Sequence, residues 1–126
     1  MKSLFSVLTW TFIFLFLGFY INTEIENFST KYENKISVIE NHIIENNWDD
    51  AKEDLEDLTK SWHKEKNIWY KLLNHEYFNN VSLNLNILDK AISLNDKPLS
   101  FEQIELIKMA LDNIVESERC DLNHIF

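Results

Sequence analysis

Glycine, proline and cysteine are nearly missing from this chain, because each occurs only once in 126 residues. The turns of β-rich proteins need glycine and proline, so their scarcity argues against a β-rich fold. A glycine-rich loop that closes around phosphate is excluded for the same reason. The single cysteine, Cys120, excludes an internal disulfide and a cysteine-based metal site. It is either a small apolar residue near a helix end or the partner in a disulfide to another chain.

Positive charge is also in short supply. The chain has 12 lysines and arginines against 21 aspartates and glutamates, which gives a formal net charge of −9. Such a chain repels the phosphates of nucleic acids and the headgroups of anionic lipids. We therefore predict no nucleic-acid binding, and we expect any attachment to a membrane to depend on apolar insertion rather than on a basic patch.

One long hydrophobic run, Leu4 to Ile21, contains no charged residue. As a helix it is about 27 Å long, which is enough to cross the hydrocarbon core of a bilayer. The hydroxyls of Thr9 and Thr11 can bond back to the helix backbone, and Tyr20 is placed as an interfacial anchor. The run predicts a transmembrane anchor in residues 1–21 that contacts the lipid bilayer through residues 4–21.

A cleaved signal peptide is the alternative explanation for this run. Its cleavage site would need small residues, whereas the run ends in GFYINTEIENF, so an uncleaved anchor is favoured. Lys2 lies on the short side of the run, and Glu24 and Glu26 come first on the long side. The positive-inside rule then predicts a single-pass protein of the cell membrane, with a cytoplasmic N-terminus and an extracytoplasmic domain in residues 22–126.

Beyond the anchor, apolar residues recur at steps of three and four, which is the period of a helix with one buried face. The first stripe continues from the anchor with no proline or glycine between them: Ile25, Phe28, Tyr32, Ile36, Ile39 and Ile43. A core stripe marked by three tryptophans follows, and it comprises Trp48, Leu55, Leu58, Trp62 and Trp69. Two more stripes run through residues 72–92 and 101–114. Single helices of this kind are unstable alone, so we predict an all-α protein: an N-terminal transmembrane helix followed by an antiparallel bundle of about four helices.

Capping residues suggest where these helices begin and end. Asn47 is a good N-cap before the second stripe. Asn67 marks a bend or a helix boundary where that stripe fails. The turn before Pro98 ends the third helix, and Ser100 with Gln103 can form a capping box at the start of the fourth. The tail CDLNHIF is expected to fray or to pack back across the bundle.

Two groups of residues resemble metal ligands, but neither has the right spacing. Clustered carboxylates on one face could bind a hard cation such as Ca²⁺, yet a straight helix rarely converges six oxygens, so a solvated face is favoured: Asp50, Glu53, Asp54 and Asp57. No pair of histidines has the H-x-x-x-H spacing of a helical zinc site: His42, His63, His75 and His124. We predict no metal and no cofactor.

A polar stripe follows the third apolar stripe at helical spacing: His75, Asn79, Ser82, Asn86 and Asp89. It is either a solvent-facing flank or a polar seam that fixes register inside the bundle or against a partner. No serine, cysteine or lysine comes with a recognisable base, so we expect no enzymatic activity and no catalytic residue.

The anchor and two motifs together resemble a known family. The motifs are W-x-x-A-x-x-x-L-x-x-L-x-x-x-W from Trp48 to Trp62 and W-x-x-L-L-N-H-E from Trp69 to Glu76, and the chain ends in N-H-I-F. This pattern is similar to the bacterial, mainly clostridial, single-pass membrane proteins grouped as domain of unknown function 4363. The resemblance implies a small membrane protein with a helical outside domain, and it supplies no catalytic residue.

The combination of anchor, one-faced helices and absent chemistry leads to a functional expectation. We expect an accessory or protein-interaction subunit whose acidic helical domain engages another membrane protein. The alternatives are an extracytoplasmic ligand-sensing bundle that acts through a membrane partner, and a metal-dependent enzyme at the membrane surface. The sequence leaves the oligomeric state open.

Overall fold

The part of the chain that the structure describes folds into four helices. The computed structural model describes residues 2–70 and 75–125, with the side chains of residues 22, 70, 75 and 118–125 left out. The helices are α1 (Lys2–Ile44), α2 (Trp48–Tyr70), α3 (His75–Ser93) and α4 (Lys97–Ile125), and the described ranges contain no strand. The predicted all-α fold is confirmed.

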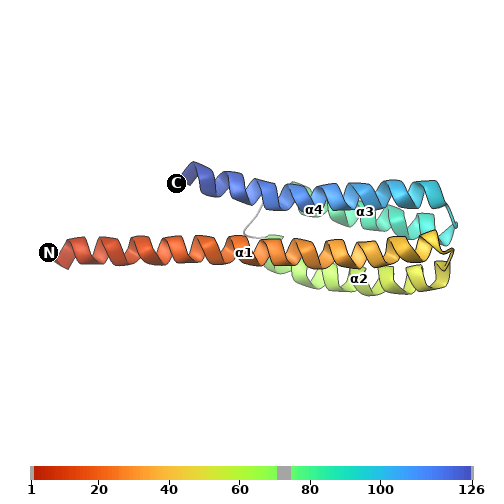
Figure 1. Cartoon of the computed structure of the whole chain (residues 1–126), viewed down its shortest axis with the longest axis horizontal. Helices are drawn as coiled ribbons and strands as arrows, with labels where there is room; N and C mark the ends of the chain where they lie inside the picture. Colours follow the sequence, from red (N-terminus) through yellow and green to blue (C-terminus); the bar gives the residue numbers. More distant parts are fainter. Residues whose placement is uncertain (1, 71–74, 126) are drawn as a thin grey trace.

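Each helix packs against two neighbours, so that the bundle forms a ring. α1 contacts α2 and α4, while α3 contacts the same two helices from the opposite corner. Figure 1 shows that the N-terminal half of α1 projects out of the bundle and that the α1–α2 and α3–α4 turns lie together at the far end. The C-terminal end of α4 continues beside α1 past the ends of α2 and α3 (Figure 1).

The projecting half of α1 is long and apolar enough to cross a membrane, and none of its apolar window is buried inside the protein. Thr9 and Thr11 donate their hydroxyl hydrogens to the carbonyl oxygens of Phe5 and Val7, each at 2.8 Å. These bonds lower the cost of exposing a hydroxyl to lipid. The helix then continues without a break to Ile44, so the apolar half is rigidly joined to the bundle.

The core of the bundle is built from the predicted stripes. The first stripe is buried throughout, from Ile25 to Ile43, and Leu55, Leu58 and Trp62 of α2 face it. α3 and α4 close the ring with further buried apolar residues, among them Phe78, Val81, Leu85, Leu88, Ile92, Ile104, Ile107, Leu111 and Ile114. Each fully buried large side chain contributes about 1.5–3 kcal/mol, which makes this core the main source of stability.

The two far-end turns have the same geometry. In the turn after α1, Asn46 lies in the left-handed region at φ 62°, and in the turn after α3, Asn95 lies there at φ 53°. After Asn46, the backbone N–H of Asn47 donates to the carbonyl of His42 at 2.8 Å. This is the Schellman arrangement, and asparagine takes the place of the usual glycine because it tolerates a positive φ.

The matching turns reveal an internal repeat. The residue numbers of Asn46 and Asn95 differ by a fixed interval. When this interval is added to the number of a core residue in the first hairpin, it gives the number of a core residue in the second. The residue pairs related in this way are all buried: Ile36 and Leu85, Ile39 and Leu88, Ile43 and Ile92, Ala51 and Ser100, Leu55 and Ile104, Leu58 and Ile107, and Trp62 and Leu111. The two hairpins therefore bury equivalent positions relative to their turns.

Three predicted boundaries were wrong. α4 begins at Lys97, because Asp96 caps it: the Leu99 N–H donates to Asp96 Oδ1 at 3.1 Å, and Ser100 lies inside the helix rather than at its cap. Pro98 fits this first turn, where a backbone N–H has no helical partner. α2 continues through Asn67 to Tyr70, and the C-terminal tail is helical to Ile125.

The left-handed turn residue gives a first testable prediction. Replacing Asn95 by alanine is expected to lower the free energy of unfolding by about 1 kcal/mol, because alanine lacks the short polar side chain whose local hydrogen bonding makes a positive φ tolerable for asparagine. Asn95→Gly should be neutral or slightly stabilising. Thermal unfolding followed by circular dichroism measures both, with Leu94→Ala at the neighbouring exposed position as the control. An equal loss for the glycine and alanine variants would contradict the prediction.

Candidate functional site

The structure places the core stripe between the helices. Leu55, Leu58 and Trp62 are buried, whereas Trp48 and Trp69 are partly buried and pack against the core from its two ends. The three tryptophans thus follow one face of α2 along its length.

The polar stripe on α3 divides between solvent and the bundle. Asn79, Asn86 and Asp89 are exposed, and the side chain of His75 lies outside the described residues. Ser82 is half-buried, and its Oγ accepts hydrogen bonds from Trp62 Nε1 at 2.9 Å and from Lys66 Nζ at 3.4 Å. Ser82 therefore lies at the interface between α3 and α2.

Of the four clustered carboxylates of α2, three face outward. Asp50, Glu53 and Asp57 are exposed, and Asp54 instead contacts α1 through His42 Nε2 at 2.9 Å. Among the residues that the structure describes, no group of three or more histidines, cysteines or carboxylates is arranged to hold a metal ion. The side chains of Cys120 and His124 lie outside the described residues.

An aromatic cluster fills the half of the core nearer the projecting segment. Trp62 lies at its centre, with the Tyr32 ring edge-on at a centroid distance of 5.2 Å and the Phe78 ring stacked at 5.7 Å. Phe28 contacts both Trp62 and Trp69, at 5.5 and 6.1 Å. Aromatic pairs at these distances add roughly 0.5–1.5 kcal/mol each beyond area burial. The cluster ties α1, α2 and α3 together.

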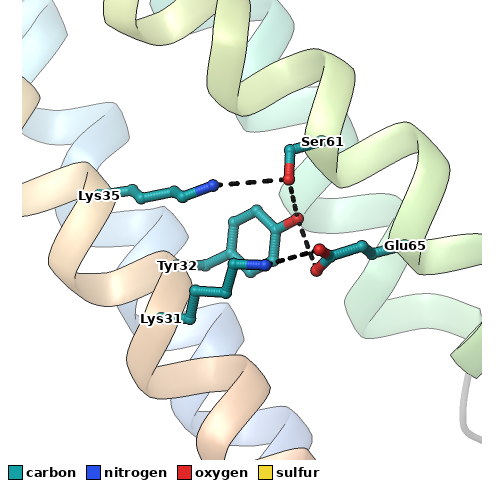
Figure 2. A network of polar contacts seen from close by, with 5 residues as sticks. All are labelled: Lys31, Tyr32, Lys35, Ser61 and Glu65. Carbon is teal, nitrogen blue, oxygen red and sulfur yellow. Dashed lines mark hydrogen bonds and ion pairs between the residues drawn. The ribbon is translucent and has the colours of Figure 1, made fainter.

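A polar network between α1 and α2 borders this cluster (Figure 2). The Tyr32 hydroxyl donates to Glu65 Oε2 at 2.9 Å and lies 2.9 Å from Ser61 Oγ. Lys31 Nζ forms an ion pair with Glu65 Oε1 at 2.6 Å, and Lys35 Nζ donates to Ser61 Oγ at 3.5 Å. Figure 2 shows the side chains of both helices converging on the Tyr32 hydroxyl.

The network changes the acidity of two of its members. Burial, helped by the bond to Glu65, raises the pKa of Tyr32 to about 12, so that the phenol keeps its proton and remains a donor. Burial alone would raise the pKa of the Glu65 carboxyl, but the bonds from Lys31 and Tyr32 outweigh it and lower that pKa below its ordinary value. Both shifts favour the observed pairing of a neutral phenol with a carboxylate.

These five side chains satisfy one another, so the network fixes how α1 and α2 pack and offers no activated nucleophile. Sequence reasoning did not find it. The available signal was Glu65, a carboxylate at a position where the apolar stripe of α2 should have continued, together with two lysines one turn apart on α1. A charged residue on a core face needs a partner from the facing helix, and these lysines supply it.

The chain can now be compared with known proteins. The family model for a domain of unknown function (DUF4363) matches residues 19–125. The chain belongs to this family. The DUF4363 match covers the whole bundle and begins at Phe19, near the end of the apolar run. No curated protein and no solved structure matches the chain. The region that the family model matches is thus the bundle, and it contains the aromatic cluster and the polar network of this chain.

The network predicts a measurable coupling between its helices. Tyr32→Phe and Ser61→Ala should each lower the free energy of unfolding by about 1 kcal/mol, because each removes one partner of a part-buried hydrogen bond. The double variant should lose less than the sum of the two. Urea titration of the full chain and the three variants in detergent measures these losses. If the loss in the double variant equals the sum of the two single losses, the two hydroxyls do not interact.

Proposed function

We propose that this chain is a single-pass membrane protein whose acidic helical bundle binds another membrane protein at the outer face of the cytoplasmic membrane. The observation that favours this role is the unbroken course of α1, which joins an apolar, unburied segment to the core of the bundle. A bundle fixed in this way lies next to the bilayer, where membrane proteins are its neighbours.

The surface available to such a partner is the outer face of α2. Its first half is net negative, because it carries five exposed carboxylates and one exposed lysine, Lys52; the carboxylates are Asp49, Asp50, Glu53, Glu56 and Asp57. Charge of one sign over a surface steers an oppositely charged partner and excludes like-charged ones. We therefore infer a partner with a basic face.

The centre of the bundle supports binding over ligand sensing or catalysis. Trp62, Tyr32 and Phe78 fill it, and the polar groups beside them are paired with one another. A small molecule would have to displace this core to enter it. We therefore infer that the outer surface of the bundle carries the binding function.

Photo-crosslinking in living cells tests the proposal. A photoreactive amino acid at Glu53 should give a discrete adduct with one other membrane protein, and the same probe at Asn113, on the exposed side of α4, should not. Replacing Asp49, Asp50 and Glu56 by lysine should abolish the adduct at Glu53. Absence of any adduct, or an adduct that survives the charge reversal, would contradict an acidic interaction surface.

The orientation of the protein is tested separately. Reporter domains fused to each end should show a cytoplasmic N-terminus and an extracytoplasmic C-terminus, as the positive-inside rule predicts. The reverse orientation would be consistent with the membrane anchor, but the bundle and its partner would then lie on the cytoplasmic side.

A further inference from the structure

The two hairpins bury equivalent positions, but they differ in the groove between their two helices on the side away from the core, which we call the outer groove. In the α1–α2 hairpin the outer groove is a hollow of about 200 Å³. His42 Nε2 contacts Asp54 Oδ2 at 2.9 Å and so links the two helices there. The lining residues are Lys35, Val38, Asp54, Asp57 and Leu58. This groove is a mainly charged surface of the kind that faces solvent.

The outer groove of the α3–α4 hairpin is apolar where that of the first hairpin is polar. The interval that relates Asn46 to Asn95 relates three polar residues of the first hairpin to three apolar residues of the second. The pairs are Asn34 and Leu83, Asp57 and Leu106, and Lys60 and Met109. The three apolar members are all exposed. The second hairpin therefore carries an uncovered apolar face in addition to the face that it buries in the core.

A buried polar atom also distinguishes this groove. Gln103 takes the place of Asp54, and Ala91 takes the place of its partner His42. Gln103 is only 6% exposed, and its Oε1 has no hydrogen-bond partner among the residues that the structure describes. An unpaired buried acceptor is destabilising. Because an amide has both donors and an acceptor, two Gln103 side chains related by a twofold axis can satisfy each other.

The heights of the groove residues along the bundle follow from the first hairpin. The contact between His42 and Asp54 shows which residues of α1 and α2 lie level with each other. The equivalent level in the second hairpin is that of Ala91 and Gln103. Because an α-helix rises about 1.5 Å per residue, the other levels on α3 and α4 follow by counting from these two residues.

Two pairs of exposed residues lie at matching heights on α3 and α4. Leu83 is within about 3 Å of the level of Met109, and Lys90 is within about 3 Å of the level of Glu102. Lys90 and Glu102 are exposed, and neither forms an ion pair with another described residue. The face thus offers an apolar contact and an ion pair to a surface that places α4 opposite α3.

A second copy of the chain presents such a surface. α1 runs unbroken from the apolar segment into the bundle, so copies anchored in one bilayer stand parallel, with their outer grooves at the same height. This step depends on the membrane anchoring proposed above. A twofold axis along the bundle then places α3 of each copy against α4 of the other, in the antiparallel order that these helices have within one chain (Figure 1). Leu83 then meets the partner's Met109, and Lys90 meets the partner's Glu102.

We propose that the outer groove of the α3–α4 hairpin is the interface of a homodimer whose twofold axis runs parallel to α1. Such an interface is isologous, so each contact between the copies occurs twice. Two copies that met through α2 would instead bring its exposed carboxylates together, and each copy has a formal net charge of −9. The dimer therefore uses the face whose charges can pair, and it leaves the acidic face of α2 open.

Disulfide crosslinking of the full chain in isolated membranes tests the dimer. Two differently tagged chains are co-expressed in a Cys120→Ser background, one with Leu83→Cys and the other with Met109→Cys. The matched control combines Asn34→Cys with Lys60→Cys, the equivalent exposed positions of the first hairpin. After mild oxidation the α3–α4 combination should give about ten times more covalent dimer with both tags than the control, because a disulfide forms only between adjacent residues. Equal yields would overturn the proposal.

A charge placed in the groove should separate the two copies. Leu106→Asp in both chains installs the residue type of its counterpart Asp57, and it would bury two unpaired carboxylates in the interface. The yield of crosslinked dimer should fall to the level of the control. Val38→Asp, at an exposed apolar position of the first hairpin, should leave the yield unchanged. Circular dichroism checks that both variants fold, and an unchanged yield with a folded Leu106→Asp chain would refute the interface.

Charge reversal tests the pairing of the two copies independently of the apolar contact. Lys90→Glu in both chains should lower the yield several-fold, because it faces the partner's Glu102, and adding Glu102→Lys should restore it. Both positions are exposed, so the bundle should fold in either variant. A double variant that crosslinks no better than Lys90→Glu alone would contradict this arrangement.

The dimer and the binding of another membrane protein can fail separately. The photo-crosslink at Glu53 reports on α2, whereas the disulfides report on α3 and α4. An adduct between two copies of the chain from the probe at Asn113 would belong to the dimer, and its mass distinguishes it from an adduct with a different protein.

Discussion

Replacing Trp62 by alanine is expected to lower the free energy of unfolding of the bundle by about 3–5 kcal/mol. The indole is fully buried at the centre of the aromatic cluster, and its Nε1 donates to Ser82 Oγ at 2.9 Å. Alanine would leave a cavity between α1, α2 and α3, and it would leave the Ser82 hydroxyl without this donor. Because domains of this size are stable by about 5–15 kcal/mol, the variant should be close to unfolding at physiological temperature.

Thermal and urea unfolding of the full chain in detergent, followed by circular dichroism, measures this loss. Trp48→Ala is the matched control, because Trp48 is only partly buried and packs against the end of the core, and it should lose clearly less. Trp62→Phe keeps a ring in the cluster and removes the donor, so it should fall between the two. Equal losses for Trp48→Ala and Trp62→Ala would show that the cluster is not the centre of stability.

The position of Trp62 illustrates what the sequence can predict about this fold. Three- and four-residue steps in α1 and α2 identified which residues turn inward, from Ile25 to Ile43 and from Leu55 to Trp62, because a one-faced helix can bury only that face. Near-absence of glycine and proline restricted the chain to helices. The number of helices and their antiparallel order then followed from the short connections.

The errors lie where local signals compete. Both Asp96 and Ser100 are good N-caps, and the choice between them depends on the Schellman turn at Asn95, which places Asp96 directly before the first helical residue. Asn67 interrupts the apolar stripe but not the helix, because one weak helix former costs only a few tenths of a kcal/mol and tertiary contacts override it.

The pairing of residues in the polar contacts could not be predicted, because it depends on which helices become neighbours. Glu65 is an exception to the stripe in the sequence, yet its partners Lys31 and Tyr32 are on another helix, and no spacing rule connects them. Periodicity predicts which face of a helix is buried. Which side chains pair between two helices depends on how those helices are aligned against each other in the folded bundle.

Placing two arginines in the apolar half of α1 should remove the protein from the membrane. Each arginine near the centre of a membrane helix costs roughly 2.5–3.5 kcal/mol, and each lost phenylalanine forfeits a further few tenths. Phe12→Arg combined with Phe16→Arg should therefore disfavour insertion by roughly 6 kcal/mol, which is enough to abolish it. Both side chains are exposed and lie outside the described core, so the bundle itself should still fold.

Alkaline extraction of membranes, followed by detection of the protein in the pellet and the supernatant, measures this change. The matched control is Val38→Arg combined with Ile44→Arg, two exposed apolar positions in the bundle half of the same helix, and it should remain in the pellet. Because the two variants add the same charge to α1, a difference between them isolates the apolar segment as the anchor. If the variant with Phe12→Arg and Phe16→Arg stays in the pellet, the bundle itself, or a partner bound to it, holds the chain at the membrane.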